Sequence, residues 1–196
     1  MRGSEGLVKA AEYSFLQSGN MLILPFFNDA TVAFNGGVLK ISTAYPYEGA
    51  VTVKIENAPR AGTALAFFKP SWAAQTAVAL NGKAVSITEK DHFISMNPTL
   101  KVGDTLLYSF KQEPYFTDTH NIHTIQGYQK VYQGPLLLGA MGKNEMTLSE
   151  KPKLIWNAAS KSVVVNPDNV TLTPINDVID NMYDCQNYKR QVLWKK

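Results

Sequence analysis

Apolar and polar residues alternate over short stretches of the chain, and turn residues separate these stretches at short intervals. In residues 51–55, valine and isoleucine occupy every second position, with threonine and lysine between them. Leu106, Tyr108 and Phe110 repeat this two-residue period after a Gly-Asp pair. Such a period is typical of a strand with one buried face. Many short strands between turns predict a mainly β fold, an antiparallel β-sandwich with a short N-terminal helix.

Asn81-Gly82 is the strongest turn signal in the sequence. Both central residues of a type I′ turn need positive φ angles, which asparagine tolerates and glycine adopts freely. Residues 77–80 and 83–87 are therefore expected to pair as adjacent antiparallel strands. The less regular second half of the chain also predicts strands, at residues 129–132, 136–140, 154–156, 163–165 and 191–194.

The beginning of the chain has a four-residue period instead. Leu7, Ala11 and Phe15 recur at this spacing, which places them on one face of a helix. Gly19 is suited to the position just after a helix end. We therefore expect a helix over residues 4–16.

These patterns divide the chain into three parts. We expect a helical segment at residues 1–19 and the β-sandwich core at residues 20–112. The strands of residues 113–196 then complete or extend the sandwich, with a short helix-compatible stretch around residues 177–183.

Composition narrows the classes of partner. Hydrophobic residues make up 45% of the 196 residues and charged residues 18%, which suits a packed core. Nineteen basic and 16 acidic residues are scattered and leave a net charge of +3, so we expect no nucleic-acid partner. The longest apolar runs, residues 21–27 and 135–141, fall far short of the roughly 20 residues that span a bilayer. We therefore expect no membrane partner.

Residues suited to metal binding or nucleophilic chemistry are few. Cys185 is the lone cysteine, so it forms no internal disulfide and no thiolate metal cluster. The three histidines are His92, His120 and His123. His120 and His123 are close in the sequence, but a metal would need a third ligand nearby. We expect loop histidines there, and no metal or cofactor.

Five segments occur in an order that resembles a known family. They are residues 43–51 (TAYPYEGAV), 68–72 (FKPSW), 80–83 (LNGK), 101–106 (KVGDTL) and 132–137 (YQGPLL). In this order they resemble the C-terminal non-catalytic β-sandwich region of beta-L-arabinofuranosidase-like glycoside hydrolases, glycoside hydrolase family 127. The resemblance covers roughly residues 7–194, and its last strand is similar to residues 190–194 (RQVLW).

The sequence differs from the family in two of these motifs and in the catalytic region. Phe68-Lys69 stands where the family has Arg-Ile before a proline, and Tyr47 stands where it has tryptophan. In full-length family members a helical barrel precedes this region and carries the catalytic glutamates and a cysteine-rich zinc site. The sequence starts after that barrel would have ended, and no residue matches those motifs. The resemblance therefore implies no catalytic residue in this chain.

Glycoside hydrolysis needs two carboxylates that flank one sugar. The acidic residues fall in turns or on exposed strand faces, and no two share a motif that indicates a common pocket. The candidates are Glu48, Glu56, Glu89, Asp91, Glu113, Asp118, Glu145 and Glu150.

Binding of a carbohydrate is a stronger hypothesis for this chain than catalysis. Sugars stack their apolar faces on exposed aromatic rings, and polar neighbours fix their orientation. Tyr45, Tyr47 and Trp72 lie beside predicted turns, where side chains reach solvent, so they are our candidate ligand-binding residues. The alternative is that these rings pack at the core and its edges. A second aromatic group consists of Tyr115, Phe116, Tyr128 and Tyr132.

The resemblance implies an accessory β-sandwich domain that gives structural support or contacts carbohydrate in polysaccharide degradation, and is not an enzyme by itself. One alternative is a stand-alone carbohydrate-binding module. Another is a fragment that docks on a separately encoded catalytic barrel or on a second copy of the chain, through residues 4–16 and 117–132. The compartment stays open, because no signal peptide is encoded whereas relatives often act outside the cytoplasm.

Overall fold

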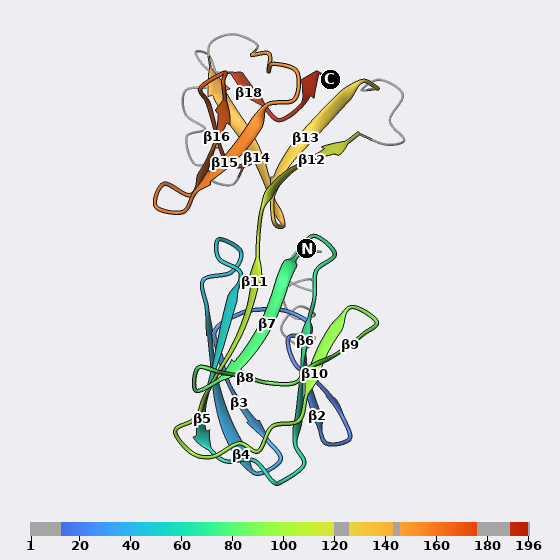
Figure 1. The fold of residues 1–196 in the computed structure, drawn as a ribbon, viewed down its shortest axis with the longest axis vertical. Helices are drawn as coiled ribbons and strands as arrows, with labels where there is room; N and C mark the ends of the chain where they lie inside the picture. Colours follow the sequence, from blue (N-terminus) through green and yellow to red (C-terminus); the bar gives the residue numbers. More distant parts are fainter. Residues whose placement is uncertain (1–12, 120–125, 143–145, 176–188, 196) are drawn as a thin grey trace, which may run out of the picture. The chain divides into compact units, whose positions relative to one another are not determined.

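A computed structural model describes residues 13–119, 126–142, 146–175 and 189–195, most of which form strands and the turns between them (Figure 1). The chain divides into two compact units, residues 1–111 and 112–196. Each unit has a hydrophobic core of its own. The predicted mainly β fold with antiparallel sheets is confirmed.

The first unit contains two sheets. The five-stranded sheet has the order β1-β2-β6-β10-β9. Its strands are β1 (Leu16–Ser18), β2 (Met21–Leu24), β6 (Ala64–Phe68), β9 (Thr88–Lys90) and β10 (Phe93–Met96). The six-stranded sheet has the order β3-β4-β5-β11-β7-β8. Its strands are β3 (Ala30–Phe34), β4 (Gly37–Thr43), β5 (Ala50–Asn57), β7 (Ala74–Leu80), β8 (Lys83–Ala84) and β11 (Thr105–Lys111).

The core of the first unit combines side chains from both of its sheets. Val51, Val53 and Ile55 of β5 are buried at every second position, as the two-residue period predicts. Leu65 and Phe67 of β6, in the other sheet, belong to the same buried cluster. The two sheets are therefore the layers of a sandwich.

One strand pair departs from the antiparallel pattern. β2 and β6 run parallel, with Met21 opposite Ala64 and Leu24 opposite Phe67. The chain between them forms β3, β4 and β5 of the other sheet before it returns. A parallel pair needs a long connection of this kind, since a short hairpin can join only antiparallel strands.

The hairpin predicted at Asn81-Gly82 is confirmed. β7 and β8 pair antiparallel, with Leu80 opposite Lys83. Asn81 and Gly82 have φ angles of 51° and 78°, the positive values that a type I′ turn requires. The second strand is shorter than predicted, although the Val85 amide still donates to the Val78 carbonyl at 2.9 Å.

The helix expected over residues 4–16 is not seen in the part of it that the structure describes. Residues 13–15 form a turn and a bend, and Leu16 begins β1, where it lies opposite Ile23 of β2. Residues 1–12, which hold most of the predicted helix, lie outside the described residues. β2 pairs with β6 on its other side, so β1 satisfies the backbone groups that this edge of β2 would otherwise leave unpaired.

The second unit is built on hydrogen-bonded strands in the order β12-β13-β14-β17-β16-β15. Two further strands pair with members of this series, β18 with β14 and β19 with β13. The bounds are β12 (Pro114–Asp118), β13 (Tyr128–Gln133), β14 (Leu136–Gly142), β15 (Lys153–Asn157), β16 (Ser162–Asn166), β17 (Val170–Pro174), β18 (Lys189–Gln191) and β19 (Trp194–Lys195).

The predicted strands of the second half are largely confirmed. β13 and β14 form the expected pair, and Trp156 lies opposite Val163 in the expected hairpin of β15 and β16. The single final strand expected at residues 191–194 is instead divided between the end of β18 and the start of β19. Trp194 is fully buried in the core of this unit. The helix-compatible stretch around residues 177–183 lies outside the described residues.

An Asn-Asp pair joins two turns of the first unit. The Asp104 carboxylate accepts hydrogen bonds from the Lys101 amide at 2.7 Å and from the Asn81 side chain at 2.8 Å. The Asn81 side-chain oxygen accepts a further bond from the Thr105 amide at 2.9 Å. The bonds from Asn81 and then Lys101 favour the ionised form and lower the pKa of Asp104.

This lowered pKa predicts a pH dependence of stability. Asp104 stabilises the fold above the pKa of an unfolded aspartate, about 3.9, and this contribution is lost as the pH falls through the lower folded-state pKa. We expect Asp104→Asn to make the acid loss of stability shallower than in the unmodified protein, as measured by melting temperature between about pH 2 and pH 6. Asn81→Ala removes the main cause of the shift and should act in the same direction. Unchanged acid slopes in both variants would contradict this assignment.

Candidate functional site

Two of the three predicted ligand residues contact the same ring. Tyr45 lies between β4 and β5, and Trp72 lies between β6 and β7. The ring of Phe110 on β11 is 6.4 Å from the Tyr45 ring and 5.8 Å from the Trp72 ring, between centroids. Phe27 packs edge-on against Tyr45 at 5.2 Å. Tyr45 and Trp72 are half-buried, and burial raises the pKa of the Tyr45 hydroxyl.

The loop that carries Tyr45 is held by hydrogen bonds of the Thr43 hydroxyl and by a bond to β11. The Thr43 hydroxyl donates to the Ala50 carbonyl at 2.6 Å and accepts from the Tyr45 amide at 3.0 Å. At the end of the loop, the Phe110 amide donates to the Gly49 carbonyl at 2.8 Å. A Cβ at Gly49 would lie 2.0 Å from the Phe110 carbonyl oxygen, so only glycine allows this approach.

Tyr47 lies in the same loop, two residues beyond Tyr45. Its amide donates to the Ala44 carbonyl at 3.0 Å, and its side chain is half-buried. The structure therefore brings Tyr45 and Trp72 together through Phe110. Carbohydrate binding by Tyr45, Tyr47 and Trp72 stays a prediction.

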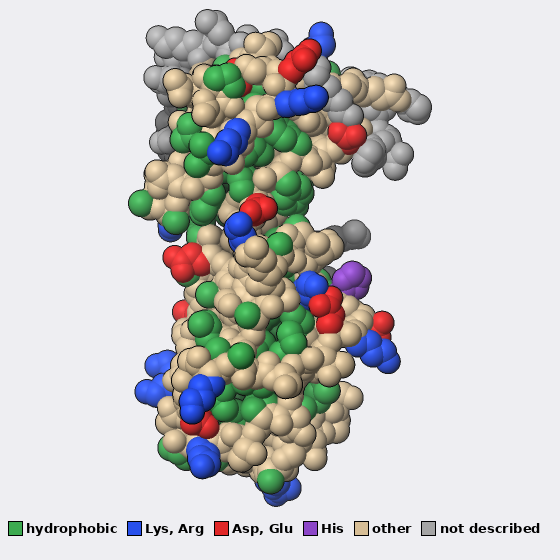
Figure 2. Space-filling view, viewed as in Figure 1, with side chains coloured by type: hydrophobic (Ala, Val, Ile, Leu, Met, Phe, Trp, Pro, Cys, Tyr) green, Lys and Arg blue, Asp and Glu red, His purple; other side chains and the backbone are tan. Residues whose placement is uncertain are grey.

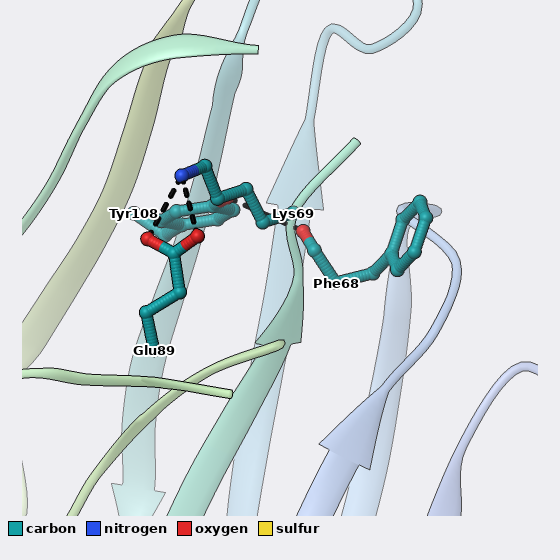
Figure 3. Close-up of polar contacts among 4 residues, drawn as sticks. All are labelled: Phe68, Lys69, Glu89 and Tyr108. Atoms are coloured by element: carbon teal, nitrogen blue, oxygen red, sulfur yellow. Dashed lines mark hydrogen bonds and ion pairs between the residues drawn. The ribbon is translucent and has the colours of Figure 1, made fainter. Parts of the chain in front are cut away.

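Tyr108 joins the two sheets of the first unit (Figure 3). Its fully buried ring stacks on Phe67 at 5.0 Å, and its hydroxyl donates to the Phe68 carbonyl at 3.2 Å. Beside it, the Lys69 ammonium binds both oxygens of Glu89, at 2.6 and 2.8 Å. Burial, and then the negative charge of Glu89, raise the pKa of Tyr108, so its hydroxyl stays protonated and donates the bond.

The second aromatic group lies on both faces of the hairpin of β12 and β13. Tyr115 lies opposite Tyr132 in the register, and their rings are nearly parallel, with centroids 5.7 Å apart and planes inclined by 17°. Side chains alternate between faces along a strand. Phe116, opposite Val131, therefore points to the other face, where Val131 is fully buried.

A cavity of about 500 Å³ opens beside Phe116 in the second unit. We call it the Phe116 cavity. It combines one aromatic ring with amide, hydroxyl, carboxylate and ammonium groups. Its lining consists of Phe116, Gln129, Ser149, Glu150, Lys151, Pro152 and Lys195.

The loop on one side of the Phe116 cavity is fixed at several points. The Ser149 amide donates to Asp168 at 3.0 Å, and the Ser149 hydroxyl donates to the other oxygen of the same carboxylate. These bonds lower the pKa of Asp168. Leu148 before the loop and Leu154 after it pack against the core of the unit. These hydrogen bonds and apolar contacts fix the wall of the cavity on this side.

The sequence predicted Phe116 only as one member of an aromatic group and Glu150 only as one of the candidate carboxylates, and nothing in it brought these residues together. The cavity forms where β12, β13, β19 and the loop before β15 meet. Residues 149–152 lie far from Phe116 in the sequence and have only the polar composition of an ordinary surface loop. Their proximity depends on strand pairing, which no local motif indicates.

The described residues show no grouping of three or more His, Cys, Asp or Glu side chains that could hold a metal ion. His120, His123 and Cys185 lie outside them. The same part of the chain contains no helix with the length and apolarity needed to cross a bilayer. On the face shown in Figure 2, charged side chains of both signs are dispersed.

Comparisons with known proteins show which family the first unit resembles. Residues 23–111 match the family described as "Beta-L-arabinofuranosidase, GH127 middle domain". A search of curated protein sequences finds no match. The predicted resemblance is confirmed.

Solved structures of glycoside hydrolases share the fold of both units. A structure titled "Glycoside hydrolase" has a TM-score of 0.73 and 19% identity, and the match covers 97% of this chain and 38% of that one. A GH127 beta-L-arabinofuranosidase from Geobacillus stearothermophilus T6 has a TM-score of 0.72 and 16% identity, over 97% of this chain and 36% of that one. The GH127 beta-arabinofuranosidase BT3674 has a TM-score of 0.68 and 17% identity, over 93% and 36%.

The chain therefore spans well under half the length of these three glycoside hydrolase structures. At these identities the likeness shows the fold. The family match of residues 23–111 lies within the first unit and includes Tyr45, Trp72 and Phe110.

The packing of Trp72 predicts a measurable loss of stability. Because its ring contacts Phe110 and is half-buried, we expect Trp72→Ala to lower the free energy of unfolding by roughly 2–4 kcal/mol, at or just below the cost for a fully buried tryptophan. Phe26→Ala, at a ring that is 54% exposed, is the control and should change stability by about 0.5 kcal/mol or less. Chemical denaturation measures both. A Trp72→Ala variant as stable as the control would instead favour an exposed sugar-binding ring.

Proposed function

We propose that this chain is an accessory β region of a glycoside hydrolase and that its first unit gives structural support. The resemblance to the GH127 middle domain supports the glycoside-hydrolase context. The observation that carries the structural role is the contact of Tyr45 and Trp72 with Phe110. Rings that close one part of a core stabilise a scaffold, whereas a sugar platform needs an open ring face.

The electrostatics of the acidic residues fit a role without hydrolysis. A glycosidase general acid needs a carboxyl pKa that is raised toward neutral pH. Asp104 and Asp168 have pKa values that are shifted downward by the hydrogen bonds they accept, so they stay ionised. Glu89 is paired with Lys69. These carboxylates hold loops and strands together.

Contact with carbohydrate is the second candidate function. The nearly parallel rings of Tyr115 and Tyr132, together with the Phe116 cavity, favour it in the second unit. Docking on a catalytic domain or on a second copy of the chain stays a prediction, because residues 4–16 and 117–132 lie partly outside the described residues.

The purified chain should release no sugar by itself. We expect incubation with p-nitrophenyl β-L-arabinofuranoside and with arabinan to give no more product than buffer alone, because Asp104 and Asp168 have lowered pKa values and accept hydrogen bonds within the protein instead of donating a proton. The measurement is nitrophenol absorbance and reducing-sugar release over a day. A GH127 beta-L-arabinofuranosidase is the positive control. Turnover that scales with the concentration of this chain would refute the accessory role.

A further inference from the structure

The Phe116 cavity has the composition of a binding site rather than of a packing gap. Binding pockets combine an apolar floor with a few convergent polar groups and commonly enclose 300–1,000 Å³. The cavity, at about 500 Å³, falls in this range. The smaller cavity of the first unit, about 290 Å³, is lined by residues 59–63 and 97–100, and contains no aromatic ring.

The lining residues suit a polyhydroxylated ring. The half-buried Phe116 offers an apolar surface for the C–H face of a sugar. Gln129 can donate and accept hydrogen bonds at once, Glu150 accepts, and Lys195 donates, which matches hydroxyl groups that do both. One acidic and two basic side chains give a lining with a small net charge.

The cavity is also preorganised. The bonds from Ser149 to Asp168 hold the loop on one side, and strand pairing fixes Phe116 and Gln129 on the other. A ligand then binds without ordering the wall, which removes a large entropic cost of association. The saving matters for sugars, because their binding already carries another cost: the hydroxyl groups give up hydrogen bonds to water.

We propose that the Phe116 cavity binds one or two sugar residues of a polysaccharide, with a ring stacked on Phe116 and hydroxyl groups bonded to Gln129 and Glu150. This inference rests on the carbohydrate-contact form of the proposed function and does not depend on the structural role of the first unit. It assigns contact to the second unit, whereas the residues expected from the sequence, Tyr45, Tyr47 and Trp72, lie in the first.

The pair of Tyr115 and Tyr132 is the competing site on the same hairpin. The Tyr115 hydroxyl donates to the Gly134 carbonyl at 3.2 Å, so this polar group is already used within the protein. The two rings also stack on each other, with centroids 5.7 Å apart, so each ring covers part of the face that a sugar would need on the other. The Phe116 cavity instead adds several polar groups to its ring.

The test is a titration of the full chain with oligosaccharides from arabinan, galactan and xylan, followed by ¹H–¹⁵N NMR. We expect at least one probe to shift the signals of residues 116, 129 and 149–151 in a saturable way. Phe116→Leu keeps an apolar side chain in the core but removes the aromatic face, and should weaken binding about tenfold, the equivalent of 1.4 kcal/mol. Gln129→Ala, which leaves the strand backbone intact, should also weaken binding.

Two matched variants make the outcome decisive. Phe26→Leu changes a half-exposed ring of the first unit and should leave affinity unchanged. Tyr132→Leu changes the competing site. If binding is lost in Tyr132→Leu but kept in Phe116→Leu, the Phe116 cavity is not the binding site, although the second unit still contacts carbohydrate. If the chain is folded by its NMR spectrum and binds none of the three probes, both the cavity proposal and carbohydrate contact are wrong. The structural role of the first unit is tested separately, by sugar release and by the stability of Trp72→Ala.

Discussion

The first unit depends on a ring stack between its two sheets. Phe67 comes from the five-stranded sheet and Tyr108 from the six-stranded sheet, and their rings lie 5.0 Å apart. The Tyr108 hydroxyl then reaches the backbone of the opposite sheet at Phe68. A buried hydroxyl without a partner would cost free energy, so the bond and the stack require the sheets to keep one spacing and one register. Phe27 and Phe110 extend the cluster from Tyr108.

This cluster explains how aromatic residues beside turns can serve a scaffold. Tyr45 and Trp72 come from loops at different places in the sequence, and Phe110 is their common contact. The backbone contact of Gly49 with Phe110 fixes the same region. In the second unit the aromatic residues are arranged differently, because β12 and β13 present rings on both faces and one of them borders a cavity. The structural support and the ligand contact that we propose thus belong to separate units.

Local sequence patterns predicted the strands and turns that depend only on residues close together in the sequence. Asn81-Gly82 predicted the hairpin of β7 and β8, and the alternation in residues 51–55 predicted a strand with one buried face. The ordered motifs also predicted the family context of residues 23–111. The parallel pairing of β2 with β6 could not be predicted, because it joins segments about forty residues apart. The spacing of Leu7, Ala11 and Phe15 predicted a helix that ends at residue 16, and only residues 13–16 of it are described. At Leu16, pairing with β2 overrides the weak local preference for a helix. The Phe116 cavity was likewise hidden, because its lining comes from four separate segments.

The most direct test of the inter-sheet stack is a double-mutant cycle. Phe67→Leu, Tyr108→Leu and the double variant are compared with the unmodified protein by chemical denaturation. If the rings stabilise each other across the sandwich, the two losses should be coupled by roughly 0.5–1.5 kcal/mol. Losses that add to within about 0.3 kcal/mol would show that the rings act independently, and would contradict the account of the first unit as a scaffold held by aromatic contacts.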